Sequence, residues 1–270
     1  MKTKALALIL LTSVLAFCGA DRIHAQQLSA AFADCGLVGS ITIYDYQKQQ
    51  WIASDIEDSH VRTLPASTFK IVNTLIALET GVIASEEEII PWPDTYDTTR
   101  YGHRPEIYHS MSMHEAFIKS AGWAYVELAK KVGKARYAQY LGQLDYGNGN
   151  LNSAGTDFWN FGGFGVSPVE QIKTLVGIYE ERYPFASRSY ATLKELMLAE
   201  QTAAYTIRAK TGWTRDGGID TGWWVGYVEQ QGNVLFFATR LIKPRTESNT
   251  RFGPCRKEIT KKVLRQLRYL

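Results

Sequence analysis

A hydroxyl and an amine stand three residues apart at the start of an apolar helical pattern. Ser67 and Lys70 flank Thr68 and Phe69, and the apolar residues that follow recur with the period of a buried helical face until Gly81. Residues at i and i+3 share a helix face, with Cβ atoms about 5 to 6 Å apart, so the amine reaches the hydroxyl. A helix N-terminus also favours nearby negative charge, which suits a serine that becomes an alkoxide and then an acyl ester.

The lysine must lose its proton before it can act as a base. Its ordinary pKa is about 10.4, so an exposed amine stays protonated at neutral pH. Burial beside apolar groups such as Phe69 would lower that pKa, and a neutral amine in a dry pocket can also take up carbon dioxide as a carbamate. A serine and a lysine at this spacing also arise by chance, as a helix cap and a solvated charge, so the interpretation depends on the rest of the chain.

The first 25 residues have the layout of a secretory signal peptide. Two lysines precede two apolar runs, which are too short to span a membrane and are followed by small and polar residues. We expect cleavage after Ala25, with Ala20 as the alternative; lipidation at Cys18 is less favoured. The sequence therefore predicts a periplasmic or secreted protein of residues 26–270 with no stable membrane anchor.

Charge and composition narrow the possible partners and the redox chemistry. Without residues 1–25 the chain carries 27 basic and 26 acidic side chains, so no basic surface for nucleic acid is expected. The 7 Trp, 15 Tyr and 11 Phe residues of the full sequence favour a large core, in a monomer or a homodimer. Only Cys35 and Cys255 remain after processing, and they either form a disulfide or stay as two buried thiols.

Strand patterns at both ends of the mature chain enclose a helical middle. Strands are expected at 38–44, 51–54, 205–210, 222–228 and 234–241. Helices are expected at 27–35, after Pro65, and at 113–119, 123–132, 134–144, from 168 onward, 190–200 and 259–270. The pattern predicts an α+β fold, an antiparallel β-sheet flanked by N- and C-terminal helices with an inserted all-helical subdomain. The sheet subdomain is placed at about 26–64 and 203–270, the helical subdomain at about 65–202, and the active site between them.

Four further short segments accompany the Ser67–Lys70 pattern. They are Ser120-Ala121-Gly122 between two helices, Tyr146-Gly147-Asn148 in a turn, Phe158-Trp159 after it, and Lys210-Thr211-Gly212 at the end of a strand. Each is weak alone, but together and in this order they resemble the class D β-lactamases, the oxacillinase family of serine hydrolases. The resemblance covers essentially the whole mature chain and implies a β-lactamase/transpeptidase-like fold.

The resemblance implies a catalytic role for five of these residues. Ser67 would be the acylated nucleophile, and Lys70, modified to N6-carboxylysine, the general base for acylation and deacylation. Trp159 would hold the carbamate through its indole N–H, since a donor-only group stabilises an anion without adding competing charge. Ser120 would relay a proton to the leaving β-lactam nitrogen, with Lys210 supplying positive charge beside it.

The same resemblance implies how a small β-lactam substrate binds. Lys210, Thr211 and Arg256 would together receive its carboxylate. Arg245 and Arg251 lie close enough in sequence to replace Arg256. The backbone N–H groups of Ser67 and Trp213 would form the oxyanion hole. The expected substrate-binding residues are Thr211, Gly212, Trp213, Arg256 and Tyr146, the last with a mainly structural alternative. Loops at 91–104 and 215–221 are expected to set the substrate spectrum.

One position departs from the family pattern. At the third position of the Ser120 segment the family usually carries a valine that caps the carbamate, whereas this chain has Gly122 followed by Trp123. The pocket around Lys70 is therefore expected to be wetter or differently covered. We hypothesise that Trp123 partly replaces the missing bulk.

The sequence thus predicts an exported β-lactamase that uses no metal and no cofactor other than carbon dioxide, hydrolyses penicillin-type antibiotics and confers resistance. A zinc-protease helix is disfavoured because His114-Glu115 lacks its second histidine at Ile118. Two alternatives remain. One is a β-lactam sensor domain that is acylated without turnover, against which the lack of a later membrane span counts. The other is a low-activity penicillin-binding peptidase, against which the Tyr-Gly-Asn and Phe-Trp segments count.

Overall fold

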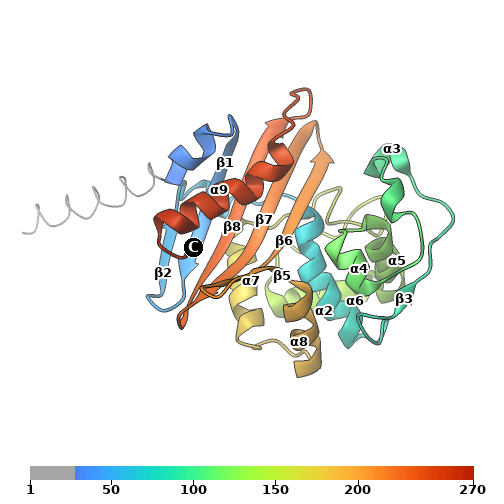
Figure 1. Ribbon diagram of the computed structural model, residues 1–270. Coiled ribbons are helices and arrows are strands. Elements are labelled where there is room, and N and C mark those ends of the chain that lie inside the picture. The colour runs from blue at the N-terminus through green and yellow to red at the C-terminus, as the bar shows by residue number, and fades with distance from the viewer. Residues whose placement is uncertain (1–27) are drawn as a thin grey trace, which may run out of the picture.

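The computed structural model describes residues 28–270, apart from the side chain of Arg100. The predicted signal peptide and its cleavage site lie outside these residues. Within them, a large sheet occupies one side of the molecule and a group of helices the other (Figure 1). The long helix α9 (Phe252–Gln266) crosses one face of the sheet, and α7 (Pro168–Tyr179) packs against strands on the other face.

The six-stranded sheet joins both ends of the chain. Its strands are β1 (Val38–Asp45), β2 (Gln50–Ala53), β5 (Leu198–Gln201), β6 (Thr206–Asp216), β7 (Ile219–Gln230) and β8 (Asn233–Pro244). They lie in the order β2-β1-β8-β7-β6-β5, and every neighbouring pair is antiparallel. The pairing of β1 with β8 brings the N-terminal strands beside the C-terminal ones, which confirms the predicted α+β sheet.

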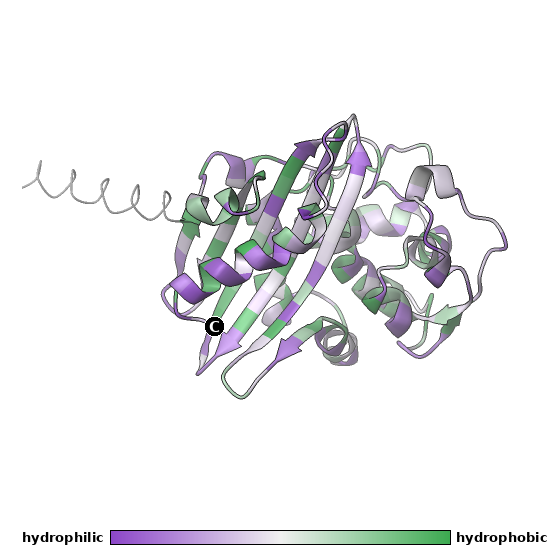
Figure 2. Cartoon of the chain, turned by 45° about the horizontal axis from the view of Figure 1, so that its top comes forward, coloured by the Kyte–Doolittle hydropathy of each residue, from purple (hydrophilic) through white to green (hydrophobic). Residues whose placement is uncertain are grey.

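The central strands are apolar because both faces of the sheet are covered. Figure 2 shows hydrophobic residues along these strands and hydrophilic residues on the outward side of α9. The adjacent residues Trp223 and Trp224 of β7 are both buried, but they belong to separate apolar clusters on opposite faces. Successive side chains of a strand alternate between faces, so this tryptophan pair helps to fill both layers of the core.

The observed strands extend beyond the predicted ones. β6 and β7 form a hairpin paired as far as Asp216 and Ile219, so Lys210-Thr211-Gly212 lies within β6 and not at its end. Gly217 and Gly218 make the turn, and their φ angles of 57° and 78° lie in the left-handed region that glycine adopts at little cost. The predicted loop at 215–221 is therefore mostly strand.

The helices match most of the predicted ranges. They are α2 (Lys70–Glu79), α3 (Thr98–Tyr101), α4 (Met113–Ile118), α5 (Gly122–Val132), α6 (Lys134–Leu144), α7, α8 (Ser187–Leu196) and α9. Residues 28–33 are also helical. Short 3-10 segments are η1 (Asp58–His60), η2 (Ala66–Phe69) and η3 (Pro105–Ile107), and β3 (Ile89–Ile90) pairs with β4 (Met111–Ser112). The predicted capping box of α7 is present, with Ser167 and Glu170 each bonding to the other's backbone N–H.

Two predicted helix boundaries were wrong. The helix expected at 190–200 ends at Leu196, because the residues after it form β5 and pair with β6. The helix expected from residue 259 begins at Phe252, and it includes Pro254. Proline is tolerated there because the first turn of a helix has backbone N–H groups without intrahelical acceptors.

Elements from the middle of the chain divide between the two halves of the molecule. Helices α2, α4, α5, α6 and α8 contribute to one apolar cluster that includes Phe69. Helix α7 contributes to the same cluster but contacts β1, β7 and β8, and β5 extends the sheet. The boundaries of the two predicted subdomains stay a prediction.

Among residues 28–270 no helix is long and apolar enough to cross a membrane.

Cys35 and Cys255 form a disulfide, which decides between the two alternatives left open by the sequence. Both residues are buried in the apolar cluster beneath α9. The bond ties the N-terminal helical turn to the first turn of α9, which begins at the edge of the cleft described below.

Replacing Cys35 and Cys255 by serine should lower the free energy of unfolding by about 2 to 4 kcal/mol, because a cross-link between distant residues restricts the unfolded chain. The two cysteines are 220 residues apart in sequence. Urea unfolding of residues 26–270 with and without reductant measures the effect. Reductant should bring the wild type to the midpoint of the double variant and leave the variant unchanged; equal wild-type midpoints in both conditions would contradict the prediction.

Candidate active site

The predicted Ser67 and Lys70 pair is formed at the junction of η2 and α2. The Lys70 Nζ donates a hydrogen bond to the Ser67 Oγ at 3.1 Å. Ser67 lies in η2, and Lys70 is the first residue of α2, so one continuous helical turn sets their separation. The local geometry expected from the i and i+3 spacing is confirmed.

The Lys70 amine lies in an apolar pocket. The residue is 1% exposed, and its Nζ lies 4.7 Å from the centre of the Tyr125 ring. Burial, with a further contribution from the positive charge of Arg104, lowers the pKa of Lys70 to about 7. A large share of the amine is therefore neutral at neutral pH, as a base requires.

Trp159 forms one wall of the same region. Its ring stacks on that of Phe69, with the centroids 5.1 Å apart, and its carbonyl oxygen accepts a hydrogen bond from the Ala66 N–H at 2.9 Å. The residue is buried. An indole N–H can donate but not accept a hydrogen bond, so it suits an anion placed beside it.

Ser120 and Lys210 form a second hydroxyl and amine pair. The Lys210 Nζ donates to the Ser120 Oγ at 3.0 Å and to the Thr211 carbonyl oxygen at 3.2 Å. Burial, and then the nearby charge of Lys70, hold the pKa of Lys210 well below its usual value. The structure thus brings together all four polar groups that the sequence assigned to proton transfer.

Two backbone positions beside these hydroxyls adopt left-handed conformations. Ala66, which precedes the nucleophile, has a φ of 53°, and Ser120 has a φ of 54°. Such conformations are unfavourable for residues with a Cβ and persist where the surrounding structure holds them, often at active sites. The Ala66 N–H is held by Trp159 and the Ser120 N–H by the Phe117 carbonyl.

Strand β6 packs directly on the nucleophile turn at Gly212. A Cβ atom at this position would lie 2.8 Å from the Pro65 carbonyl oxygen and 3.2 Å from the Thr68 nitrogen. Only glycine allows this close approach. The next residue, Trp213, is then placed at the mouth of the cleft, where it is partly exposed.

Arg256 reaches the cleft from the first turn of α9. Its guanidinium donates to the Gly212 carbonyl and, at 2.9 Å, to the Gly253 carbonyl. Burial lowers the pKa of Arg256 to about 10, so the side chain is still charged at neutral pH. The alternative Arg251 instead pairs with Glu258, and neither Arg251 nor Arg245 lines the cleft.

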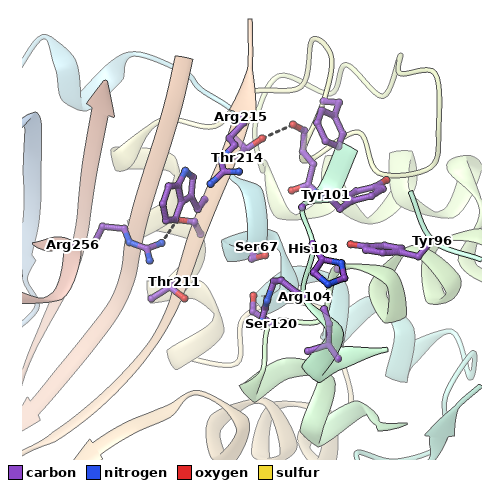
Figure 3. A pocket seen from close by; sticks show the side chains of 17 residues that line it. Ser67, Tyr96, Tyr101, His103, Arg104, Ser120, Thr211, Thr214, Arg215 and Arg256 are labelled. Carbon is purple, nitrogen blue, oxygen red and sulfur yellow. Dashed lines mark hydrogen bonds between the residues drawn. The ribbon is translucent and has the colours of Figure 1, made fainter. Parts of the chain in front are cut away.

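These groups surround a cleft of about 500 Å³ between β6 and the helical half (Figure 3). Its lining residues are Ser67, Tyr96, Tyr101, Gly102, His103, Arg104, Ile107, Ser120, Gly122, Asn160, Phe161, Thr211, Gly212, Trp213, Thr214, Arg215 and Arg256. Three arginines and no carboxylate belong to this set. An electropositive cleft of this kind favours an anionic ligand.

Comparison with known proteins agrees with this geometry. Residues 42–265 match the penicillin binding protein transpeptidase domain. The chain is 34% identical over 239 residues to the β-lactamase OXA-48 of Klebsiella pneumoniae. The aligned residues cover 88% of this chain and 86% of that protein. The chain belongs to the class D β-lactamases. The class D β-lactamase structure from Sebaldella termitidis superposes with a TM-score of 0.84, at 37% identity over 90% of this chain and 96% of that one.

A regulatory protein also matches this class D β-lactamase. The regulatory protein BlaR1 of Bacillus licheniformis is 26% identical over 226 residues, which cover 83% of this chain but 37% of BlaR1. The identity is lower than that to OXA-48, and the match spans a minor part of BlaR1.

Two residues of this β-lactamase have places that differ from those expected. Tyr146 does not line the cleft; its ring is buried against Phe69, and its hydroxyl donates to the Gln171 side chain at 3.0 Å. Its place fits the mainly structural alternative. Trp123 is buried and does not line the cleft itself, but its indole N–H donates at 2.6 Å to the carbonyl of Ile107, which does. The hypothesis that Trp123 partly replaces the bulk absent at Gly122 stays a prediction.

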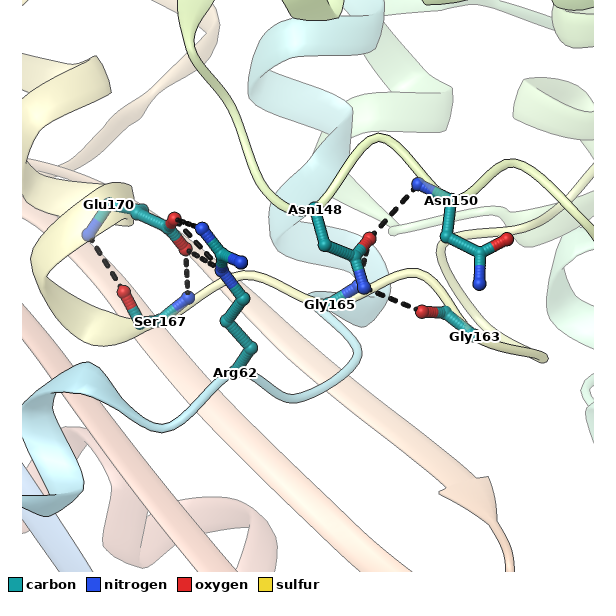
Figure 4. A network of polar contacts seen from close by, with 7 residues as sticks. All are labelled: Arg62, Asn148, Asn150, Gly163, Gly165, Ser167 and Glu170. Carbon is teal, nitrogen blue, oxygen red and sulfur yellow. Dashed lines mark hydrogen bonds and ion pairs between the residues drawn. The ribbon is translucent and has the colours of Figure 1, made fainter.

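Asn148 holds the loop that carries Trp159. Its side-chain oxygen accepts from the N–H groups of Asn150 and Gly165, and its amide nitrogen donates to the Gly163 carbonyl at 2.8 Å (Figure 4). The contacts join the beginning of the loop to its end. The Tyr-Gly-Asn segment thus acts by fixing the loop on which the tryptophan sits.

The sequence analysis did not single out the side chains on the opposite wall. Arg104 extends toward Ser120 (Figure 3) and donates to the Lys119 carbonyl at 3.1 Å and to Glu106 at 2.8 Å. Tyr96 and Tyr101 come from the same segment. No periodic pattern marks this segment; its tyrosines and prolines were the one available signal.

Arg104→Gln should shift the acidic limb of the pH–rate profile to higher pH. The positive charge of Arg104 helps burial to lower the pKa of Lys70, so its removal raises that pKa and leaves more of the amine protonated near pH 7. The ratio of kcat/KM at pH 6 to that at pH 8.5 should fall about twofold or more relative to the wild type.

Arg215→Gln is the matched control for this prediction. It removes another arginine of the cleft, but one whose charge does not contribute to the Lys70 shift. An unchanged ratio in Arg104→Gln, or an equal change in both variants, would contradict the assigned electrostatic effect.

Proposed function

We propose that this class D β-lactamase hydrolyses the amide bond of penicillin-type β-lactams through a Ser67 acyl-enzyme, with carbamylated Lys70 as general base, and thereby confers resistance. The observation that carries the proposal is the buried Lys70 amine, 3.1 Å from the Ser67 Oγ and with its pKa lowered to about 7. The predicted signal peptide supports action in the periplasm or outside the cell.

The substrate would be held by the positive wall of the cleft. Penicillin-type substrates carry a carboxylate, and Lys210, Thr211 and Arg256 lie together on the side formed by β6 and α9. Arg256 offers its planar fork of N–H donors, and Lys210 a compact charge. The two carbonyl groups that orient Arg256 fix its guanidinium at the edge of β6.

In the acylation step, Lys70 would take the Ser67 proton as the Oγ attacks the β-lactam carbonyl carbon. The developing oxyanion would be stabilised by the backbone N–H groups of Ser67 and Trp213. As the carbon–nitrogen bond breaks, Ser120 would donate its proton to the nitrogen and regain the proton that Lys70 took from Ser67, so that Lys70 is again free to act as a base. Because Lys210 is hydrogen-bonded to the Ser120 Oγ, its amine can stabilise the serine as the proton leaves.

In the deacylation step, a water molecule must lose a proton to a base as it attacks the ester carbonyl. The released Ser67 oxygen then regains a proton, which completes hydrolysis. A carbamate on Lys70 would supply a carboxylate-like base for this step. The surroundings of Lys70 fit such a group, because the amine lies in an apolar pocket and the Trp159 ring stands in one wall of this region.

The similarity to BlaR1 supports one alternative. A sensor domain with the same nucleophile would form the acyl-enzyme and hold it, since release needs a competent base. The two functions share the first chemical step and differ in the second. Turnover therefore separates them, whereas labelling of Ser67 does not.

Steady-state hydrolysis of a chromogenic cephalosporin by residues 26–270 should be sustained and raised by bicarbonate. Lys70→Ala should lower kcat by about 10² to 10⁴-fold, the range for loss of a general base. Lys131→Ala, which removes an exposed lysine of α5, is the matched control. A single stoichiometric burst that bicarbonate does not extend would instead identify a sensor or a penicillin-binding peptidase.

A further inference from the structure

The Lys70 amine is buried, with helix α5 against it. The Tyr125 ring lies beside the amine, and the Tyr125 hydroxyl is hydrogen-bonded to Thr74 of α2 at 2.8 Å, which fixes α5 against α2. Gly122 stands three residues before Tyr125 on α5, so it shares the same helix face, and it lines the cleft. On this face α5 therefore presents no side chain at the position that lines the cleft.

The Tyr96 hydroxyl occupies the space in front of Gly122. A Cβ atom at Gly122 would lie 3.3 Å from the Tyr96 oxygen, which is closer than an ordinary van der Waals contact. Tyr96 lines the cleft together with Gly122 and Ser67. A side chain at position 122 and the Tyr96 hydroxyl thus compete for one space.

Stacked rings hold Tyr96 in this place. Its ring lies parallel to that of Tyr101, with the centroids 4.9 Å apart, and contacts the rings of Trp92 and Tyr108. Tyr101 in turn donates a hydrogen bond to Asp157 at 2.5 Å, two residues before Trp159. The segment that carries Tyr96 is therefore tied to the loop that forms the other wall of the Lys70 pocket.

We propose that Tyr96 is a positioning residue that covers the Lys70 pocket from the cleft side and so retains carbon dioxide on the amine. This inference rests on the proposed carbamate. The neutral amine nitrogen attacks the carbon of carbon dioxide and loses one proton to solvent, and release returns a proton to nitrogen as the carbon–nitrogen bond breaks. Excluding cleft water disfavours the ammonium form of Lys70, and the neutral amine is the form that takes up carbon dioxide, so the cover favours the carbamate.

A tyrosine hydroxyl suits this position chemically. Burial, more than any neighbouring charge, raises the pKa of Tyr96, so the hydroxyl stays neutral over the working pH range. A neutral group adds no anion that would repel a carbamate. It also remains a hydrogen-bond donor that a purely apolar cover would not provide.

The test measures carbon dioxide retention directly, on the free enzyme of residues 26–270. The carbamate signal is recorded by NMR with ¹³C-labelled bicarbonate, and the bicarbonate concentration for half-maximal turnover is measured in parallel. Tyr96→Ala should raise that concentration about tenfold, and Tyr96→Phe, which removes the one atom in front of Gly122, about threefold. Tyr96→Phe should keep the wild-type thermal unfolding profile, whereas Tyr96→Ala should still unfold cooperatively but at a lower temperature, because the stacked ring is lost.

A second substitution tests whether a side chain at position 122 of α5 can take over the role of Tyr96. In Tyr96→Ala, adding Gly122→Val should return the bicarbonate dependence toward the wild-type value, because the valine fills the vacated space. Non-additive effects of the two substitutions on the bicarbonate dependence would show that the two side chains fill the same space. A general loss of structure would not be repaired by a second substitution.

The possible results distinguish the proposed role of Tyr96 from the proposed function of the enzyme. A wild-type carbamate signal that is equally strong in Tyr96→Ala and Tyr96→Phe would overturn the role of Tyr96 and leave the proposed function intact. A higher KM with unchanged bicarbonate dependence would likewise overturn it, because it would make Tyr96 a substrate contact. Absence of any carbamate signal in the wild type would overturn both. If Tyr96→Ala does not fold, Tyr96→Phe decides.

Discussion

Burial of the Lys70 amine is the constraint on which the rest of the site depends. An ammonium ion in apolar surroundings is unfavourable, so the fold favours the neutral amine and brings its pKa to about 7. That burial requires α5 to lie against α2 and the Trp159 ring to stack on Phe69. The apolar cluster around Phe69 is therefore both the core of the helical half and the wall of the site, and substitutions within it are expected to alter chemistry and stability together.

A second consequence is an excess of positive charge in the cleft. Lys210 is buried as well as Lys70, and the positive charge of Lys70 helps to lower the pKa of Lys210. Arg104 and Arg256 add their charges, while the described lining residues include no carboxylate. An arriving carboxylate removes part of this repulsion, so binding of an anionic substrate and protonation of Lys210 should favour each other.

The parts of the site that sequence could predict are those fixed by local geometry. The Ser67 and Lys70 contact follows from helical spacing alone, and the capping box of α7 from four adjacent residues. Gly212 was wrongly placed at the end of a strand. A glycine is needed at this position because β6 approaches the Pro65 carbonyl closely, and a tertiary contact of this kind leaves no local pattern in the sequence. The disulfide joins residues 220 apart, and only the assembled fold could decide it. Arg104 and Tyr96 come from a segment placed by ring stacking, for which no periodic pattern exists.

Because Tyr96 comes from a loop, the covering of Lys70 depends on the shape of the cleft. If a side chain at position 122 closed the Lys70 pocket, helix α5 alone would set its place. Here Tyr96 is held by Tyr101, which is tied through Asp157 to the loop of Trp159. A substitution in the 91–104 segment that admits a bulkier substrate would therefore also move the cover. For this chain, substrate range and retention of carbon dioxide are expected to change together, because the same rings determine both.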